Sequence, residues 1–151
     1  IAGLDILSNF GINIQGNAVS GRPYTATIQP LELGGAGFKG ALNGARKPWT
    51  FALNLRVDKT FKLSKGGNSI NAYIRVSNLL DRENILDVYS ASGSAYDDGY
   101  LASSRGLNQI ATIEGSTREV SSYLAAYQWS ILNPGFFSLP RRIFAGMIYD
   151  F

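Results

Sequence analysis

The sequence contains no histidine and no cysteine, and only 17% of its 151 residues are charged. Without histidine the chain lacks the commonest general base and the commonest metal ligand. Without cysteine it has no thiol nucleophile, no thiolate metal site and no disulfide. An enzyme made of these residues would depend on carboxylates, lysine, serine or tyrosine, and the sequence places no such pair together. We therefore expect no catalytic activity, no metal and no cofactor.

Two further absences narrow the class of protein. The charged residues, 14 Lys+Arg and 11 Asp+Glu, are spread thinly along the chain, so the clustered basic surface of a nucleic-acid-binding protein is missing. No run of about 18 apolar residues exists that would predict a transmembrane helix. The sequence begins at Ile1 with neither an initiator methionine nor a leader pattern. We therefore expect a mature chain or a piece of a longer one.

What the sequence does contain is alternation of apolar and polar residues with a period of two. This pattern predicts four strands of about ten residues each, over residues 9–18, 49–58, 70–77 and 142–151. Helical spacing in the first segment would have to include Gly11, Gly16 and three asparagines, which are poor helix formers. The sequence therefore predicts an all-β, antiparallel fold.

The connections between the predicted strands differ greatly in length. Residues 62–68 form a short turn, whereas residues 21–48 and 91–139 are long. Short turns at one end of the strands and long loops at the other are typical of outer-membrane barrels. In the second loop, residues 116–119 read as a capping box that precedes apolar residues at helical spacing, so we expect one short helix there.

Three weaker signals have ordinary explanations. The letters GAGFKG at residues 35–40 match a dinucleotide-binding pattern, but no strand–turn–helix context surrounds them, and a glycine-rich loop is favoured. Asp87, Asp97 and Asp98 lack the spacing of a cation-binding loop. Six aromatic residues would line a ligand vestibule or else belong to a membrane girdle and to loop packing: Trp49, Tyr89, Tyr100, Tyr123, Tyr127 and Trp129.

The two long loops carry charges of opposite sign. The first is mainly basic, with Arg22, Lys39, Arg46 and Lys47, and the second has more acidic than basic residues. Attraction between the loops is therefore expected, although exposed ion pairs contribute little each.

Several segments resemble the C-terminal barrel strands of TonB-dependent outer-membrane receptors. They are SGRPYT (20–25), NGARKPW (43–49), VSNLLD (76–81), DDGYL (97–101), NP (133–134) and LPRRI (139–143), followed by a final Phe151. The resemblance covers nearly the whole chain. It implies that residues 1–151 are the last four or so strands of a barrel of about 22 strands with a plug in its lumen. Plug and N-terminal regions have no counterpart in this sequence.

The resemblance also implies a function and a location. Such receptors lie in the outer membrane of Gram-negative bacteria, with their long loops extracellular, and import scarce nutrients with energy from the inner membrane. The implied partners are the rest of the barrel with its plug, the TonB-type energising complex and the barrel-assembly machinery; a surface lipoprotein is a further candidate. Residues resembling the assembly signal are Ile143, Met147, Tyr149 and Phe151.

This interpretation assigns each residue a side. Phe51, Leu53, Leu55, Ile74 and Met147 are expected to face lipid, and Asn54, Arg56, Asn71 and Arg75 to face the plug. Candidate extracellular ligand or partner contacts are Arg22, Arg46, Trp49, Asp97, Asp98, Tyr100 and Trp129. Alternatives are a small or oligomeric outer-membrane barrel, acting as an adhesin or in surface assembly or secretion, and a soluble all-β binding module.

Overall fold

The computed structural model of the chain describes residues 8–30, 33–34, 37–63 and 67–151. The chain is divided into two compact units. We call Ile1–Val19, Phe51–Glu83 and Leu139–Phe151 the sheet unit, and Ser20–Thr50 with Asn84–Ser138 the loop unit.

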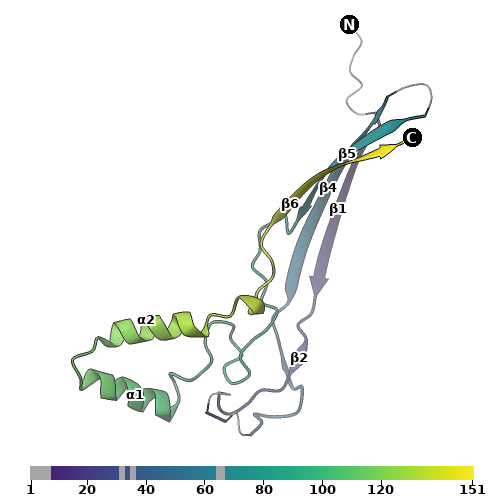
Figure 1. The fold of residues 1–151 in the computed structure, drawn as a ribbon. Helices are drawn as coiled ribbons and strands as arrows, with labels where there is room; N and C mark the ends of the chain where they lie inside the picture. The colour runs from purple at the N-terminus through teal and green to yellow at the C-terminus, as the bar shows by residue number, and fades with distance from the viewer. Residues whose placement is uncertain (1–7, 31–32, 35–36, 64–66) are drawn as a thin grey trace. The chain divides into compact units, whose positions relative to one another are not determined.

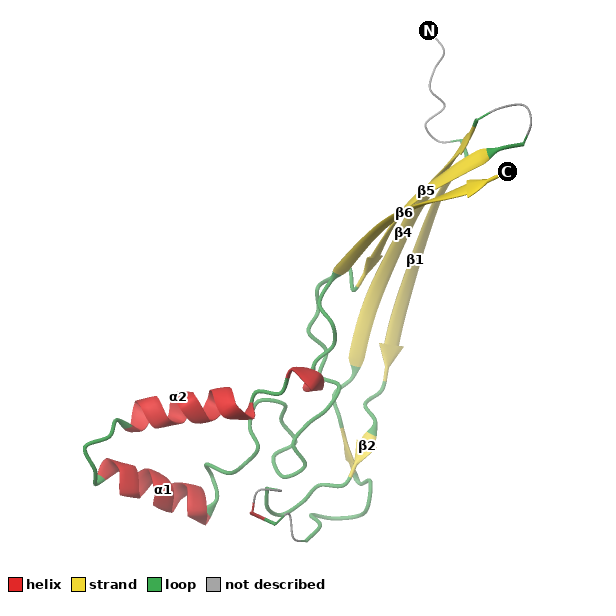
Figure 2. Cartoon of the chain, in the orientation of Figure 1, coloured by secondary structure: helices red, strands yellow, loops and turns green. Residues whose placement is uncertain are grey.

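The sheet unit contains a four-stranded antiparallel sheet. Its strands are β1 (Phe10–Val19), β4 (Thr50–Lys62), β5 (Ser69–Ser77) and β6 (Arg142–Asp150), in the order β1-β4-β5-β6 (Figures 1 and 2). All four strands predicted from the alternation are confirmed. β4 continues four residues beyond the predicted end, because its pairing with β5 runs on to Lys62 opposite Ser69.

Strand register separates the side chains into two faces, since residues directly opposite on neighbouring strands share a face. Leu55 lies opposite Val76, and Val76 lies opposite Ile143. In the next apolar row across the sheet, Val57 lies opposite Ile74, and Ile74 lies opposite Ala145. We call this side the apolar face. The predicted grouping of the apolar residues on one side of the sheet is confirmed.

The opposite side, the polar face, carries a network of side-chain contacts. Asn71 Nδ2 donates hydrogen bonds to Thr60 Oγ1 at 2.9 Å and to Asp58 Oδ2 at 3.4 Å. Arg56 Nε lies 3.3 Å from Asp58 Oδ1, and its guanidinium lies over the ring of Tyr73. Since Asn71 and Tyr73 alternate with apolar residues of β5, the polar side chains of two strands contact one another on this side.

A glycine makes room for one of these rings. Tyr73 lies opposite Gly146, and a Cβ on Gly146 would come within 2.6 Å of the ring and hydroxyl of Tyr73. The Tyr73 ring therefore lies over bare backbone of β6, which holds it beside Arg56.

The loop unit contains shorter elements. Two strands of two residues, β2 (Pro23–Tyr24) and β3 (Ala45–Arg46), pair antiparallel. Two helices, α1 (Ser104–Glu114) and α2 (Val120–Ile131), are followed by a 3₁₀ turn, η2 (Pro134–Phe136). In Figure 2 the two helices form a hairpin. Neither of them, among the residues described, has the length and apolarity of a membrane-crossing helix.

Two details of the predicted helix are wrong. The sequence predicts one helix in residues 91–139, but α1 precedes α2. The predicted capping box at residues 116–119 does not form, because α2 begins only after Glu119 and Ser116 is not its N-cap. The Ser116 hydroxyl instead donates to the carbonyl of Ile113 at the end of α1. Glu119 is the N-cap of α2 and makes no side-chain capping bond.

The glycine-rich motif is only partly described, since Gly35 and Ala36 lie outside the described residues. Gly37 and Gly40 both have positive φ, and Phe38 bridges Thr27. Bends and turns follow Gly40, where a dinucleotide-binding loop would begin a helix.

Candidate functional site

All seven predicted ligand contacts belong to the loop unit. Arg22 and Arg46 are exposed beside the β2–β3 pairing, where Arg46 lies opposite Pro23. Trp49 is 57% exposed and Trp129 is 76% exposed. The structure thus leaves these four side chains accessible within their unit.

Asp98 is the exception, because its side chain is buried with only 1% of the residue exposed. Its Oδ1 accepts a hydrogen bond from the backbone N–H of Tyr100 at 2.9 Å, and its Oδ2 accepts one from the Tyr127 hydroxyl at 2.5 Å. The rings of Tyr100 and Tyr127 stack at 5.4 Å between centroids. Asp98 and Tyr100 are therefore brought together as structural supports of the loop, and Asp98 does not present its carboxylate to solvent.

Tyr123 extends this aromatic group. Its ring centroid lies 6.2 Å from that of Tyr127. Burial raises the pKa of the Tyr123 hydroxyl, and the neighbouring Tyr100 adds to this shift. Of the helix aromatics in the sequence prediction, Tyr123 and Tyr127 thus pack within the loop unit, whereas Trp129 is exposed.

The remaining predicted carboxylates do not converge. Asp97 Oδ1 accepts from the N–H of Gly99 in a local turn, while Asp87 pairs with Lys47 at 2.7 Å. Within the described ranges no group of three metal-ligating residues gathers, so no metal-binding arrangement is found there.

The pairing of Lys47 with Asp87 connects the first long loop to residues 84–90, which precede the second, as does a hydrogen bond between the hydroxyls of Thr27 and Ser90 at 3.0 Å. Burial alone would raise the pKa of the Asp87 carboxyl. The hydrogen bond from Lys47, the N–H of Val88 and the charge of Lys47 outweigh that effect, and the pKa is lowered. Neither contact involves residues 91–139, so the expected attraction between the two long loops stays a prediction.

Two hollows of the loop unit have the dimensions of ligand sites. The larger, about 790 Å³, lies beside the start of α1, and its charged lining residues are Lys39, Asp97 and Arg105. The smaller, about 400 Å³, is lined by Tyr96, Gln128, Trp129 and Leu132. Both combine polar and apolar groups, the composition that small-molecule sites share.

Comparisons of the chain with protein-family models, with curated proteins and with solved structures found no match. The family resemblance therefore stays a prediction from the motifs.

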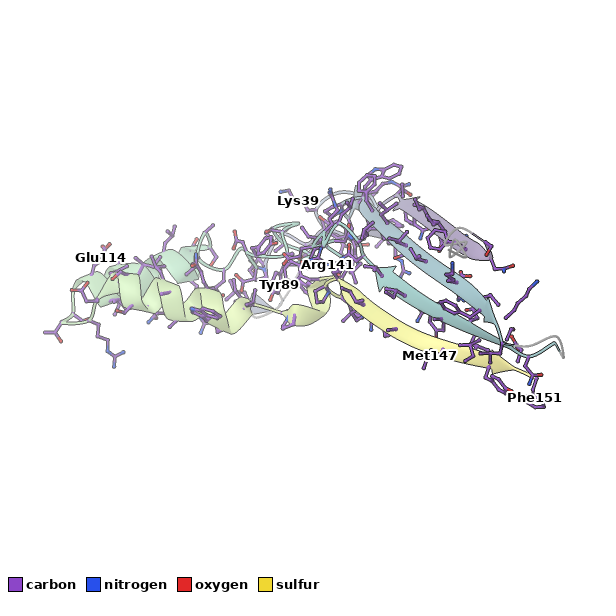
Figure 3. The ribbon with its side chains drawn as sticks, turned by 90° about the horizontal axis from the view of Figure 1, so that it is seen from above. Lys39, Tyr89, Glu114, Arg141, Met147 and Phe151 are labelled. Carbon is purple, nitrogen blue, oxygen red and sulfur yellow. The ribbon has the colours of Figure 1, made fainter. Side chains whose placement is uncertain are left out.

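The four residues resembling an assembly signal lie on or beyond β6, at the end of the strand order. Ile143, Met147 and Tyr149 are on the apolar face, opposite Val76, Ala72 and Ile70. Phe151 is 99% exposed and stacks on Tyr149 at 6.1 Å. Figure 3 labels Met147 and Phe151 on this strand.

Sequence reasoning missed two features. The contact between Asp98 and Tyr127 joins residues 29 positions apart, and no local pattern indicates it. Arg142 lies on the same face as Arg56 and Arg75, and only the strand register shows how close the three are. Extending the alternation argument across strands would have grouped these arginines.

Proposed function

We propose that the sheet unit is part of the wall of an outer-membrane β-barrel of the TonB-dependent receptor kind, which binds a scarce nutrient and imports it. The observation that carries this proposal is the contrast between the two faces of the sheet. One face is apolar and widely exposed within its unit. The other holds the charged and amide network of Arg56, Asp58 and Asn71.

The exposure of the apolar face is large for a folded domain in water. Ile12 is 60%, Ile14 65%, Ile143 67% and Met147 77% exposed. A contiguous apolar surface of this kind marks a contact with a membrane or with another protein. Strands of 9 to 13 residues also have the length that a tilted transmembrane strand requires. Lipid contact explains both features together.

Four strands do not close into a barrel, because the smallest membrane barrels have about eight. Unpaired backbone groups at an open sheet edge cost several kcal/mol each in lipid. The proposal therefore requires further strands beside β1 and β6, from the same polypeptide or from other copies. A polar, plugged lumen would then face Arg56, Asn71 and Arg75.

The loop unit would be extracellular under this proposal. Its accessible residues Arg22, Arg46, Trp49 and Trp129 and its two hollows would serve ligand or partner recognition. The partners proposed are the rest of the barrel with its plug, the energising complex, the assembly machinery and a surface lipoprotein. No enzymatic activity is part of the proposal.

Fractionation of the source cells tests this function. The chain is expected in the outer-membrane fraction and is expected to stay there through an alkaline carbonate wash. Release into the wash, with monodisperse behaviour in the absence of detergent, would replace the proposal with the soluble all-β binding module.

The intact mass of the membrane species then separates the two ways of completing the barrel. A mass several times the 16.4 kDa of this chain supports a receptor in which the same polypeptide supplies the other strands. A mass of 16.4 kDa would replace the transporter with a small or oligomeric barrel.

A further inference from the structure

Three arginines form a continuous group on the polar face of the sheet. Arg56 of β4 lies directly opposite Arg75 of β5, and Arg75 lies directly opposite Phe144 of β6. Arg142 is opposite Ser77, which places it diagonally beside Arg75. Neighbouring strands are about 4.8 Å apart, so the group spans about 10 Å across three strands. We call it the arginine cluster.

Like charges directly opposite each other destabilise a sheet. Aromatic rings offset part of this cost, because Arg56 lies over Tyr73 at 4.7 Å and Arg75 over Phe144 at 4.9 Å. Arg142 lies over the same Phe144 ring at 5.7 Å. The rings hold the guanidinium groups in place but supply no negative charge.

The acidic groups of the described polar face do not balance the cluster. Asp58 contacts Arg56, and Asp150 lies opposite Ser69 at the other end of the strands, in the row of Lys62. Among the described residues, Arg75 and Arg142 make neither an ion pair nor a hydrogen bond to a carboxylate, and both are exposed in the sheet unit. Guanidinium groups bind carboxylates in a planar, two-bonded geometry that suits this arrangement.

We propose that the arginine cluster is a docking site for an acidic segment of the same polypeptide outside residues 1–151, whose carboxylates pair with Arg75 and Arg142. A free anion is disfavoured for two reasons. The polar face around the cluster is part of an open sheet surface, whereas small-molecule sites are concave. Single exposed ion pairs also contribute little, so an ion bound by them alone would dissociate readily. A protein segment adds contacts along the rest of the face, where the Thr60 hydroxyl accepts from Asn71 and keeps its own hydrogen to donate.

The inference rests on the proposed function in one respect, because a polar lumen wall is where a covering segment is required. It names the chemistry of that segment, which the proposed function leaves open. Charge complementarity alone assigns an acidic character to the segment, because three arginines have only the carboxylate of Asp58 near them.

Zero-length cross-linking tests the docking site in membranes that contain the complete protein. Arg75→Lys and Arg142→Lys keep the positive charge and introduce primary amines, which a water-soluble carbodiimide couples to carboxylates in contact. Mass spectrometry of the digest is expected to find both positions joined to one acidic segment of the same polypeptide outside residues 1–151. Coupling to a separate protein instead would overturn the proposal. Coupling from both positions to the same segment is the supporting result.

Two control variants allow a negative cross-linking result to be interpreted. Arg141→Lys has Asp81 as its known neighbour, with 3.9 Å between Arg141 Nη2 and Asp81 Oδ2, and is expected to couple to it. Asn17→Lys, on the polar side of β1, is expected to yield at most a tenth of the cross-link to that segment. Coupling of Arg141→Lys alone, or of Arg75→Lys to Asp58 alone, overturns the proposal.

A titration with inorganic phosphate, followed by the cross-linking yield, separates a free anion from a protein segment. Coupling of Arg75→Lys that is recovered only to Asp58 and is lost in millimolar phosphate would identify an adventitious ion only and overturn the docking proposal. Membrane fractionation of the same samples reports the proposed function independently. A carbonate-soluble protein that still cross-links would refute the barrel while leaving the acidic docking site standing.

Discussion

The side-chain amide of Asn78 donates a hydrogen bond to the backbone carbonyl of Leu139, 61 residues further along the chain, at 3.2 Å. The same amide nitrogen donates to the carbonyl of Arg82 at 2.9 Å, and Asn78 Oδ1 accepts from the Arg82 N–H at 3.1 Å. The N–H of Asn78 itself donates to Asn54 Oδ1. One buried side chain thus joins the segment after β5 to the segment that leads into β6.

Replacing this side chain without straining the backbone is the first test. Asn78 has a φ of 54°, which glycine also adopts freely, so Asn78→Gly removes the three side-chain hydrogen bonds without straining the folded backbone. We expect a loss of about 2 kcal/mol in stability, since buried partners are left unsatisfied. Urea unfolding of the purified protein in detergent measures it, and the amide of Arg82 should exchange faster with solvent.

Asn43→Gly is the matched control. Asn43 has a φ of 55° and is exposed, and only its backbone N–H takes part in a hydrogen bond, to Thr25 Oγ1. The free energy of unfolding of this variant should lie within a few tenths of a kcal/mol of that of the parent protein. Equal effects of the two substitutions would mean that the Asn78 side chain does not secure the start of β6.

The second test asks which face of the sheet contacts lipid. Leu53→Arg places a charge on the apolar face, where an arginine near the bilayer midplane costs about 2–4 kcal/mol. Ala52→Arg places the same charge on the neighbouring residue of β4, which points to the polar face. We expect the amount of folded protein in the outer membrane to fall sharply for Leu53→Arg and little for Ala52→Arg. Normal levels of folded Leu53→Arg would refute the lipid-facing assignment.

The sheet was predictable from sequence because its information is local. Alternation in residues 49–58 and 142–151 gives each strand its faces, and the short turn near Asn68 gives one antiparallel pairing. The helix α1 was missed because its glycine and polar residues weaken the helical pattern. Gly106 is required there by tertiary structure: a Cβ would come within 2.2 Å of the carbonyl oxygen of Tyr100. The burial of Asp98 likewise depends on a contact with α2 that no local pattern encodes.

The buried carboxylate of Asp98 provides the third test. Tyr127→Phe removes the hydroxyl that donates to Asp98 Oδ2 and leaves that oxygen buried without its partner. We expect the loop unit to lose about 1–3 kcal/mol of local stability. Hydrogen exchange at the amide of Tyr100, which donates to Asp98 Oδ1, should accelerate accordingly.

Tyr123→Phe is the control for this substitution, because it removes a hydroxyl from the next ring of the same aromatic group. Its effect on exchange at Tyr100 should be small. If both variants accelerate exchange equally, the aromatic packing and not the hydrogen bond to Asp98 holds the loop unit together.

The last test uses pH to probe the ion pair between Lys47 and Asp87. The pKa of the Asp87 carboxyl is lowered from its usual 3.8, so the folded loop binds the ionised form preferentially. The resulting stability is fully present above the unfolded pKa of about 3.9 and is lost as pH falls through the lowered folded value. Asp87→Asn should therefore speed hydrogen exchange of residues 84–90 at pH 6, and the difference from the parent should vanish once the pH is below the lowered pKa of Asp87. Asp97→Asn, whose carboxylate accepts only from the local N–H of Gly99, serves as the comparison and should leave this segment unchanged at both pH values.

Because the Asp87 side chain is half exposed, 1 M salt should weaken the effect at pH 6. A difference between Asp87→Asn and the parent that is the same at pH 6 and at a pH below the lowered pKa of Asp87 would mean that the charge of Asp87 contributes nothing to the connection between the first long loop and residues 84–90.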